Sequence, residues 1–169
     1  TTRMAAQIKS IDATAIVHER DVINDGIAED VRRSEVQEDI LSGLYGNRYK
    51  AVYIAVPCSS YSIVRGDQIR SKSEPRGTRA AMARWGAYLA KHNQLADFSA
   101  FVLEICVELG VPWMVENPAD RSLDGPAHWR EFADWGCLWD QPRFRALILE
   151  GANLHLVPMC ACGSTFQKY

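Results

Sequence analysis

The chain has 169 residues, of which 47% are hydrophobic and 24% are charged. This length suits one α/β domain with a core of its own and excludes two domains of ordinary size. The formal net charge of −2 excludes a surface that is basic overall, so contact with a nucleic acid would need a local cluster of Lys and Arg.

The five cysteines stand at positions 58, 106, 137, 160 and 162. An odd number at these spacings fits neither a disulfide framework nor a complete zinc site, because Cys160 and Cys162 would supply only half of the four ligands. We therefore expect no metal and a reducing compartment. The sequence has no apolar run of about 18 residues and no basic-then-apolar leader. We expect a soluble, intracellular protein of the cytoplasm or nucleus, with no membrane contact.

The first part of the chain predicts two helices and two strands. Apolar residues at helical spacing predict a helix over residues 2–10, and a short β-branched run predicts a buried strand over 13–17. A capping box formed by Ser34 with the Gln three residues later predicts a helix that ends near Gly46. The clearest strand is residues 50–56 (KAVYIAV), which stops before Pro57 because proline cannot donate to a central ladder.

A long polar loop should follow, over residues 59–79. It contains Gly, Pro, four arginines and Lys72, and we expect it to be mobile or ordered by a partner. An Ala-rich helix is predicted over 80–109, either continuous or broken near His92, with Gly110 at its end. Residues 111–116 (VPWMVE) predict a strand.

A helix from Pro142 to Glu150 and a last short strand from Leu154 to Val157 should complete the chain. The alternation of strands and helices predicts parallel pairing with right-handed crossovers. We therefore expect residues 13–17, 50–56 and 111–116 to be neighbouring parallel strands of one α/β domain spanning residues 1–169.

Two of these strands end in short polar loops, Pro57-Cys58 and Glu116-Asn117-Pro118. In an open parallel sheet, ligands bind at the carboxyl ends of the strands. A thiol near a carboxyl group is the minimum apparatus for adding a nucleophile to an electron-poor ring and moving protons on it. The residues alone leave open that Cys58 is an inert buried cysteine and that Glu116 caps a backbone amide.

The segment VYIAVPCSSYSIVRG (residues 52–66) resembles the Pro-Cys motif of DNA (cytosine-5) methyltransferases, and WMVENPADR (residues 113–121) resembles their Glu-Asn motif. The chain is most similar to a divergent group found in phage and retroelement-like open reading frames, with the pattern Pro-Cys-Ser/Thr-x-x-Ser-x-x-Arg. The likeness covers residues 15–169. Its matches are Pro57, Cys58, Ser59, Ser62, Arg65, Arg70-Ser71, Pro75-Arg76-Gly77, Asn93-Gln94-Leu95, Glu116-Asn117-Pro118 and a late segment from Cys160 to Lys168.

The resemblance implies a three-layer, Rossmann-like methyltransferase fold with a mostly parallel sheet, and a catalytic loop that includes Asn117. It implies that the Cys58 thiolate adds to carbon 6 of a flipped-out cytosine while Glu116 holds the nitrogen edge of the ring, after which carbon 5 takes a methyl group. Arg65 would stabilise the ring oxygen or a phosphate, or else form a surface ion pair.

The implied methyl donor is S-adenosylmethionine. Its ribose would be held by Glu19 or Asp21 and its adenine by Asp30, with Pro57 beside it. The implied partner is DNA, or RNA, bound through the arginine-rich loop 59–79.

The chain also departs from the family. No Phe-x-Gly-x-Gly cofactor loop precedes Thr1 and no target-recognition domain follows Tyr169, so we expect a partial fold truncated at both ends. The run from Gln141 to Arg145 matches a Gln-x-Arg-x-Arg motif only by coincidence.

Three functions remain open at this point. The first is an S-adenosylmethionine-dependent cytosine methyltransferase, and the second is a catalytically inactive module of the same fold that binds nucleic acid or protein. The third, a cysteine hydrolase, has the least support, because the histidines at 18, 92, 128 and 155 show no local signature of a catalytic base for Cys58.

Overall fold

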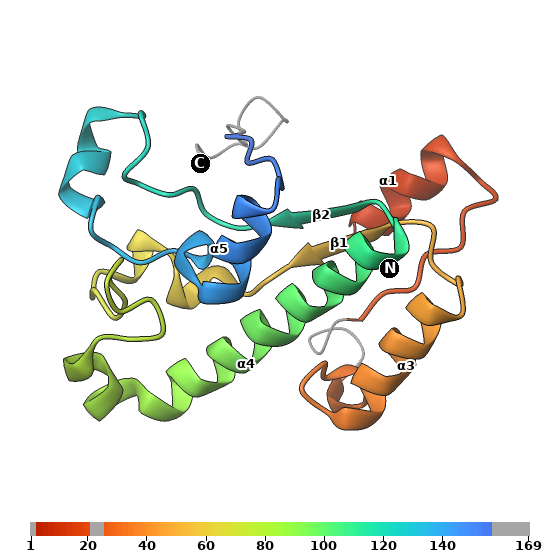
Figure 1. Ribbon diagram of the computed structural model, residues 1–169, viewed down its shortest axis with the longest axis horizontal. Coiled ribbons are helices and arrows are strands. Elements are labelled where there is room, and N and C mark those ends of the chain that lie inside the picture. Colours follow the sequence, from red (N-terminus) through yellow and green to blue (C-terminus); the bar gives the residue numbers. More distant parts are fainter. Residues whose placement is uncertain (1–2, 21–25, 157–169) are drawn as a thin grey trace. The chain divides into compact units, whose positions relative to one another are not determined.

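The structure, a computed structural model, describes residues 3–20 and 26–156 (Figure 1). The chain divides into two compact units, Thr1–Gly43 and Leu44–Tyr169. Within the described residues, no helix is both long enough and apolar enough to cross a membrane.

The first unit contains α1 (Arg3–Ile11), the 3-10 turn η1 (Gly26–Glu29) and most of α3 (Ser34–Tyr45). Both predicted helices of this region are confirmed, the first shifted by one residue. The predicted capping box does not form as expected, because the Gln37 side chain donates to the Val31 carbonyl oxygen at 2.9 Å.

The predicted strand over residues 13–17 is wrong. Residues 13–14 form a turn and 15–20 have no regular structure. The physical cause is Asp12, whose carboxylate accepts bonds from the Thr14 backbone at 2.8 Å and the Thr14 hydroxyl at 2.6 Å. Such an Asx turn satisfies the backbone locally, and Ile16, expected to be buried in the sheet, is exposed.

The second unit is built on a parallel pair of strands, β1 (Val52–Ala55) and β2 (Trp113–Glu116). The predicted pairing of residues 50–56 with 111–116 is therefore confirmed, over four residues of each strand. Residues 154–156 form no strand, and Val157 lies outside the described residues. The described part of the chain thus has a mixed helix and strand architecture with a two-stranded sheet. It is compatible with an α/β class, but does not show the predicted three-layer sheet.

Helix α4 (Arg79–Leu109) is the crossover between the two strands. Thr78 caps its start by accepting from the Ala81 backbone at 3.1 Å, and Gly110 ends it in the left-handed conformation that favours glycine. The helix is continuous through His92, where a break was an alternative, and its one non-helical residue is Trp85. Helix α5 (Pro142–Leu149) agrees with the predicted 142–150.

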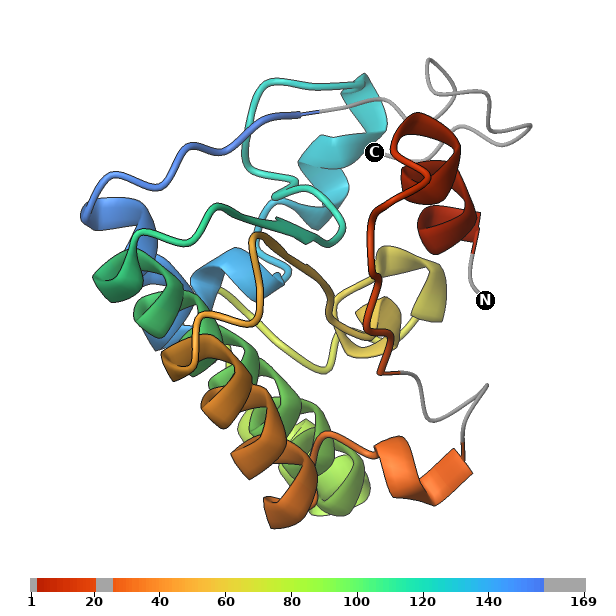
Figure 2. The same ribbon diagram turned by 90° about the vertical axis from the view of Figure 1, so that its right-hand side faces the viewer.

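The core lies on one face of this sheet. Ile54 and Val115 contact residues of α4 and α5, and both figures show α4 running along the two strands with α5 beside it (Figures 1 and 2). The core cluster consists of Val56, Tyr61, Ala96, Ala100, Leu103, Leu138, Phe144 and Leu147. The opposite face of the sheet exposes Tyr53 and Met114, which the parallel register pairs with each other.

The segment 59–79 contains the 3-10 turns η2 (Cys58–Ser60, which begins one residue earlier) and η3 (Ile63–Arg65). The loop 59–79 was expected to be polar and mobile or ordered by a partner, but its residues 69–71 are buried and an isolated antiparallel bridge joins Ser71 to Trp135. The mobility of the exposed remainder stays a prediction. Two further 3-10 turns, η4 (Ala127–Phe132) and η5 (Leu138–Asp140), lead to α5.

Candidate functional site

The carboxyl ends of β1 and β2 lie side by side, because the register pairs Ala55 with Glu116. Neighbouring strands are about 4.8 Å apart, so the loops that hold Cys58 and Glu116 begin at one edge of the sheet. Asn117 joins them: its buried amide Nδ2 donates to the Val56 carbonyl oxygen at 2.7 Å. A carbonyl oxygen can only accept, so this bond determines which end of the amide faces Val56.

Cys58 opens η2 three residues after β1 ends, and it is exposed. Pro57 precedes it in an extended conformation, and the turn is closed by the Tyr61 backbone, which donates to the Cys58 carbonyl oxygen at 2.8 Å. Cys106 and Cys137 are buried, and burial raises the pKa of Cys106 to about 11. Within the described residues, Cys58 is therefore the accessible thiol.

Glu116 is the last residue of β2 and is exposed. It lies on the same sheet face as Tyr53, whose pKa is raised by partial burial and by the negative charge of Glu116. In the part of the chain that the structure describes, no side-chain hydrogen bond or ion pair involves Cys58 or Glu116. The two reactive groups therefore share an edge of the sheet without a hydrogen bond between them, and their joint contact with one ring stays a prediction.

Arg65 ends η3 and lies against two aromatic rings of α4. Its guanidinium carbon is 4.5 Å from the centre of the Trp85 ring and 4.7 Å from that of Tyr88. The Nε atom is buried with no hydrogen-bond partner. Arg65 has no ion pair within the described residues, so the surface ion pair considered above is not present there.

The other motif residues of the segment converge on Arg70, which is 1% exposed. Its guanidinium donates to the Ser60 carbonyl oxygen at 3.2 Å, the Pro75 carbonyl oxygen at 2.6 Å and Asn93 Oδ1 at 2.7 Å. Asn93 in turn donates to the Arg76 carbonyl oxygen at 2.9 Å. Arg70 therefore links the turn that begins at Cys58 to α4 by hydrogen bonds, and we interpret it as a residue that positions this turn. Burial lowers the pKa of Arg70.

A further polar chain starts at Ser59, the residue after Cys58. Tyr88 donates to the Ser59 hydroxyl at 2.8 Å, and the same hydroxyl is 3.4 Å from His92 Nε2. The rings of Tyr88 and His92 are 4.4 Å apart. Sequence reasoning found no histidine for this loop, although the i, i+4 spacing of Tyr88 and His92 places both on one face of the helix.

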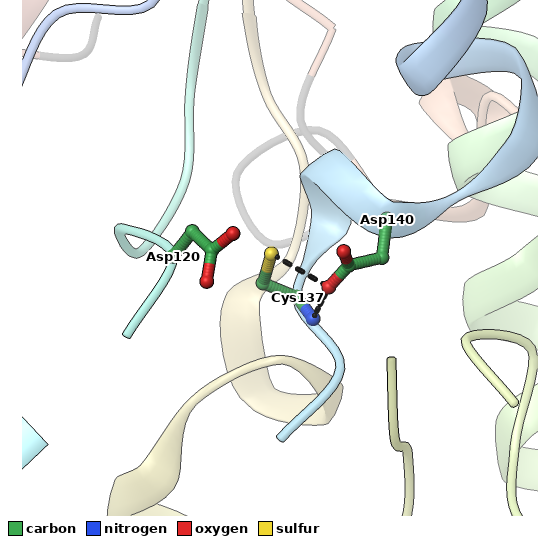
Figure 3. A group of neighbouring side chains, drawn as sticks. All are labelled: Asp120, Cys137 and Asp140. Atoms are coloured by element: carbon green, nitrogen blue, oxygen red, sulfur yellow. Dashed lines mark hydrogen bonds between the residues drawn. The ribbon is translucent and has the colours of Figure 1, made fainter. Parts of the chain in front are cut away.

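Two carboxylates and a thiol form a second cluster, which sequence reasoning also missed. The potential ligand atoms of Asp120, Cys137 and Asp140 lie within 4.8 Å of one another (Figure 3). Cys137 donates from its sulfur to Asp140 Oδ2 at 3.0 Å, and burial followed by the charge of Asp140 raises the pKa of this thiol.

Lys72 supplies the positive charge of this cluster. Its ammonium is 2.7 Å from Asp120 Oδ2 and 3.3 Å from Asp140 Oδ1. Burial acts to raise the pKa of Asp120, but the hydrogen bond from Lys72 contributes to a net lowering. Because the ammonium occupies the space between the carboxylates, we interpret the cluster as an ion-pair network. It joins the segment after η3 to the loops that follow β2 and η4.

The residues predicted to hold the cofactor lie in the first unit, apart from Pro57. Glu19 is half-buried in the irregular segment 15–20 and Asp21 lies outside the described residues. Asp30 is buried and engaged: Arg32 donates to its carboxylate through Nε at 2.8 Å and also through Nη2. These bonds hold the pKa of Asp30 at about 2 despite burial. The Asp30 carboxylate as it stands therefore does not fit the role of an adenine acceptor.

Comparison of the chain with protein-family models, curated proteins and solved structures found no match.

Two side chains of the run from Gln141 to Arg145 form hydrogen bonds within the protein. Gln141 is buried and donates to the Pro75 carbonyl oxygen at 2.5 Å, while Arg143 Nε donates to Glu104 at 2.9 Å. Arg145 is exposed, as expected. The late motif from Cys160 to Lys168, which includes the two cysteines judged insufficient for a zinc site, lies outside the described residues.

Proposed function

We propose that this chain is a DNA (cytosine-5) methyltransferase-like domain with Cys58 as the nucleophile. One observation supports the proposal above the rest: the register of β1 and β2 brings the Pro57-Cys58 and Glu116-Asn117 loops to one edge of the sheet, and Asn117 bonds across that edge to Val56. The exposed thiol and the exposed carboxyl group can both reach a molecule bound there.

The proposed chemistry follows from these two groups. The Cys58 thiolate forms a bond to carbon 6 of cytosine, which makes carbon 5 electron-rich. Glu116 hydrogen-bonds the nitrogen edge of the ring and holds the proton that allows this addition. After methylation at carbon 5, a base transfers the carbon 5 proton to solvent; the electron pair left behind re-forms the carbon 5–carbon 6 double bond and expels the Cys58 sulfur as the thiolate. In a duplex the base must leave the stack first, at an unstacking cost of a few kcal/mol, whereas in a single strand the base is already accessible.

S-adenosylmethionine would supply the methyl group when bound. Of the residues expected to hold it, Pro57 lies next to the nucleophile, whereas Asp30 is engaged by Arg32. Under this proposal the two-stranded sheet is part of a larger, three-layer Rossmann-like fold in an intracellular protein. The nucleic acid would reach the site along the segment after Cys58.

A second candidate is a catalytically inactive module of the same fold that binds nucleic acid or protein. It is favoured by the engaged carboxylate of Asp30 and, within the described residues, by the lack of a hydrogen bond between Cys58 and Glu116. The two candidates differ in whether a cofactor binds at all.

Methyl transfer to cytosine-containing oligonucleotides, measured as 5-methylcytosine by mass spectrometry, tests the first candidate. We expect product with the unaltered chain, none with Cys58→Ser, and retained activity with Cys106→Ala, which removes a buried thiol. Calorimetry with S-adenosylhomocysteine separates the candidates. Micromolar binding supports the methyltransferase, while no binding at millimolar ligand together with no product supports the inactive module.

A further inference from the structure

One face of the first half of α4 is basic and aromatic. From Arg79 to Ala96 the helix has three basic residues and no acidic one, and from Asp97 to Leu109 it has three acidic residues and no basic one. Arg84, Tyr88 and Lys91 follow one another at spacings of four and three, so they share a face of the helix. Together with Arg65 and Trp85 they form what we call the basic-aromatic strip.

The cations of this strip lack an anionic partner among the residues that the structure describes. Arg65, Arg84 and Lys91 form no ion pair with any described residue. Nearby cations differ: Arg70 is buried, Lys72 is bound between two aspartates, and Arg76 forms a two-bond ion pair with Asp97 at 2.9 Å. The segment 59–79 was expected to bind nucleic acid as a whole, but within it Arg65 and Arg79 are the cations that lack internal ion pairs.

The aromatic rings of the strip hold the guanidinium groups in place. Arg65 lies over both Trp85 and Tyr88, and the guanidinium carbon of Arg84 is 5.0 Å from the Trp85 ring centre. Trp85 is also the non-helical residue of α4, with φ −121° and ψ 16°. The two rings meet edge to face, with centres 6.3 Å apart. Trp85 and Tyr88 are half-buried and also pack against the cluster of buried residues Ile69, Ala81 and Leu89. Their exposed parts and the guanidinium groups that lie over them together form a surface on which a planar ring can stack.

The strip begins at the candidate active site. Tyr88 donates to Ser59 at 2.8 Å, and Ser59 follows Cys58 directly in the chain. A strand of nucleic acid lying on the strip would thus pass next to the thiol. A polyanion that contributes only charge, such as an acidic peptide, would leave this stacking surface of rings and guanidinium groups without a planar partner.

We propose that the basic-aromatic strip binds single-stranded nucleic acid, with phosphates on Arg65, Arg84 and Lys91 and bases stacked against Trp85 and Tyr88. The inference rests on the proposed function, which it deepens by naming the strand state of the substrate and the surface that holds it. A single strand exposes base faces without the unstacking cost of a duplex.

Fluorescence anisotropy with a labelled oligo(dT) strand and no methyl donor tests the strip. The variant Arg65→Gln/Arg84→Gln/Lys91→Gln removes three charges from it. The matched control, Lys50→Gln/Arg130→Gln/Arg145→Gln, removes three exposed charges elsewhere in the second unit. We expect the strip variant to bind roughly tenfold or more weakly, and the slope of log affinity against log salt to fall by about 2, as for three lost phosphate contacts on a single strand.

A second comparison isolates stacking from charge. Trp85→Leu should weaken oligo(dT) binding by about 5- to 150-fold, the range for one lost base–aromatic contact, while Trp85→Phe should retain most of it. Circular dichroism before each titration confirms that the variants are folded.

The proposal is overturned if the strip and control variants bind equally, if Trp85→Leu binds like Trp85→Phe, or if a duplex or polyglutamate competes as well as an unlabelled single strand. Because oligo(dT) contains no cytosine and no cofactor is present, these outcomes do not depend on methyl transfer. Methylation that is unaffected in the strip variant would overturn the strip and leave the proposed function standing. Strip-dependent binding without any methylation would support the strip and contradict the proposed function.

Discussion

Replacing Arg70 by methionine should destabilise the protein by about 2–4 kcal/mol. The substitution removes the donors for the Ser60 carbonyl oxygen and for Asn93 Oδ1, both in buried residues. The Pro75 carbonyl oxygen keeps a partner in Gln141. Each orphaned buried acceptor costs about 1–3 kcal/mol. Part of this loss is offset, because methionine carries no buried charge that must be desolvated.

Urea unfolding followed by circular dichroism measures this change, with Arg76→Met as the matched control. Arg76 forms a half-exposed ion pair with Asp97, which is worth about 0–1 kcal/mol. With a urea dependence of about 1–3 kcal/mol per molar, the Arg70→Met midpoint should fall by about 1–2 M and that of Arg76→Met by under about 0.5 M. Alkylation of Cys58 should also change only in Arg70→Met, because its turn loses an anchor. Equal midpoints for the two variants would refute the positioning role of Arg70.

Three other predictions follow from single contacts. Asn117→Ala should lower stability by about 1–2 kcal/mol in urea and reduce any methyl transfer; unchanged stability would show that its bond across the strands is unimportant. Cys58 should react with iodoacetamide at neutral pH well before Cys106, whose pKa is raised to about 11, as read by peptide mass mapping; equal rates would contradict the assigned exposures. Since the folded-state pKa of Asp30 is held at about 2 by Arg32, below its ordinary value, its contribution to stability is present above about pH 4 and lost as pH falls through 2. Asp30→Asn should flatten that acid limb in pH-dependent unfolding, and an unchanged limb would refute it.

The elements that the sequence predicted best are those with strong local signals. The helix from Arg79 to Leu109 has a Thr cap, an Ala-rich interior and a terminal Gly, and the strand at Val52–Ala55 combines β-branched residues with a stop at Pro57. The parallel pairing of this strand with Trp113–Glu116 could be predicted because parallel neighbours need a long crossover, usually a helix, and such a helix separates the two strands in sequence. The strand over 13–17 failed because one side chain, Asp12, forms a turn.

The candidate site was predictable in its residues but not in its contacts. Cys58 and Glu116 followed from strand ends, whereas the burial of Arg70 and the ion pairs of Lys72 depend on partners about 20 to 70 residues away in sequence. No local pattern distinguishes an arginine that stays at the surface from one that becomes buried. The loop 59–79 was therefore assigned as uniformly polar, although it supplies both a structural anchor and unpaired surface charge.

The charge distribution of α4 opposes the dipole of its own helix. Backbone dipoles place partial positive charge at the start of a helix and partial negative charge at its end. Helix α4 carries Arg79 and Arg84 near its start, no acidic residue in its first turn, and Glu104 and Glu108 near its end. Added salt screens this unfavourable arrangement and should stabilise the free helix, while the same salt weakens binding of any polyanion to the basic half. One negative charge from outside the helix does lie at its start, because the Glu74 carboxylate accepts from the Arg79 backbone at 3.2 Å.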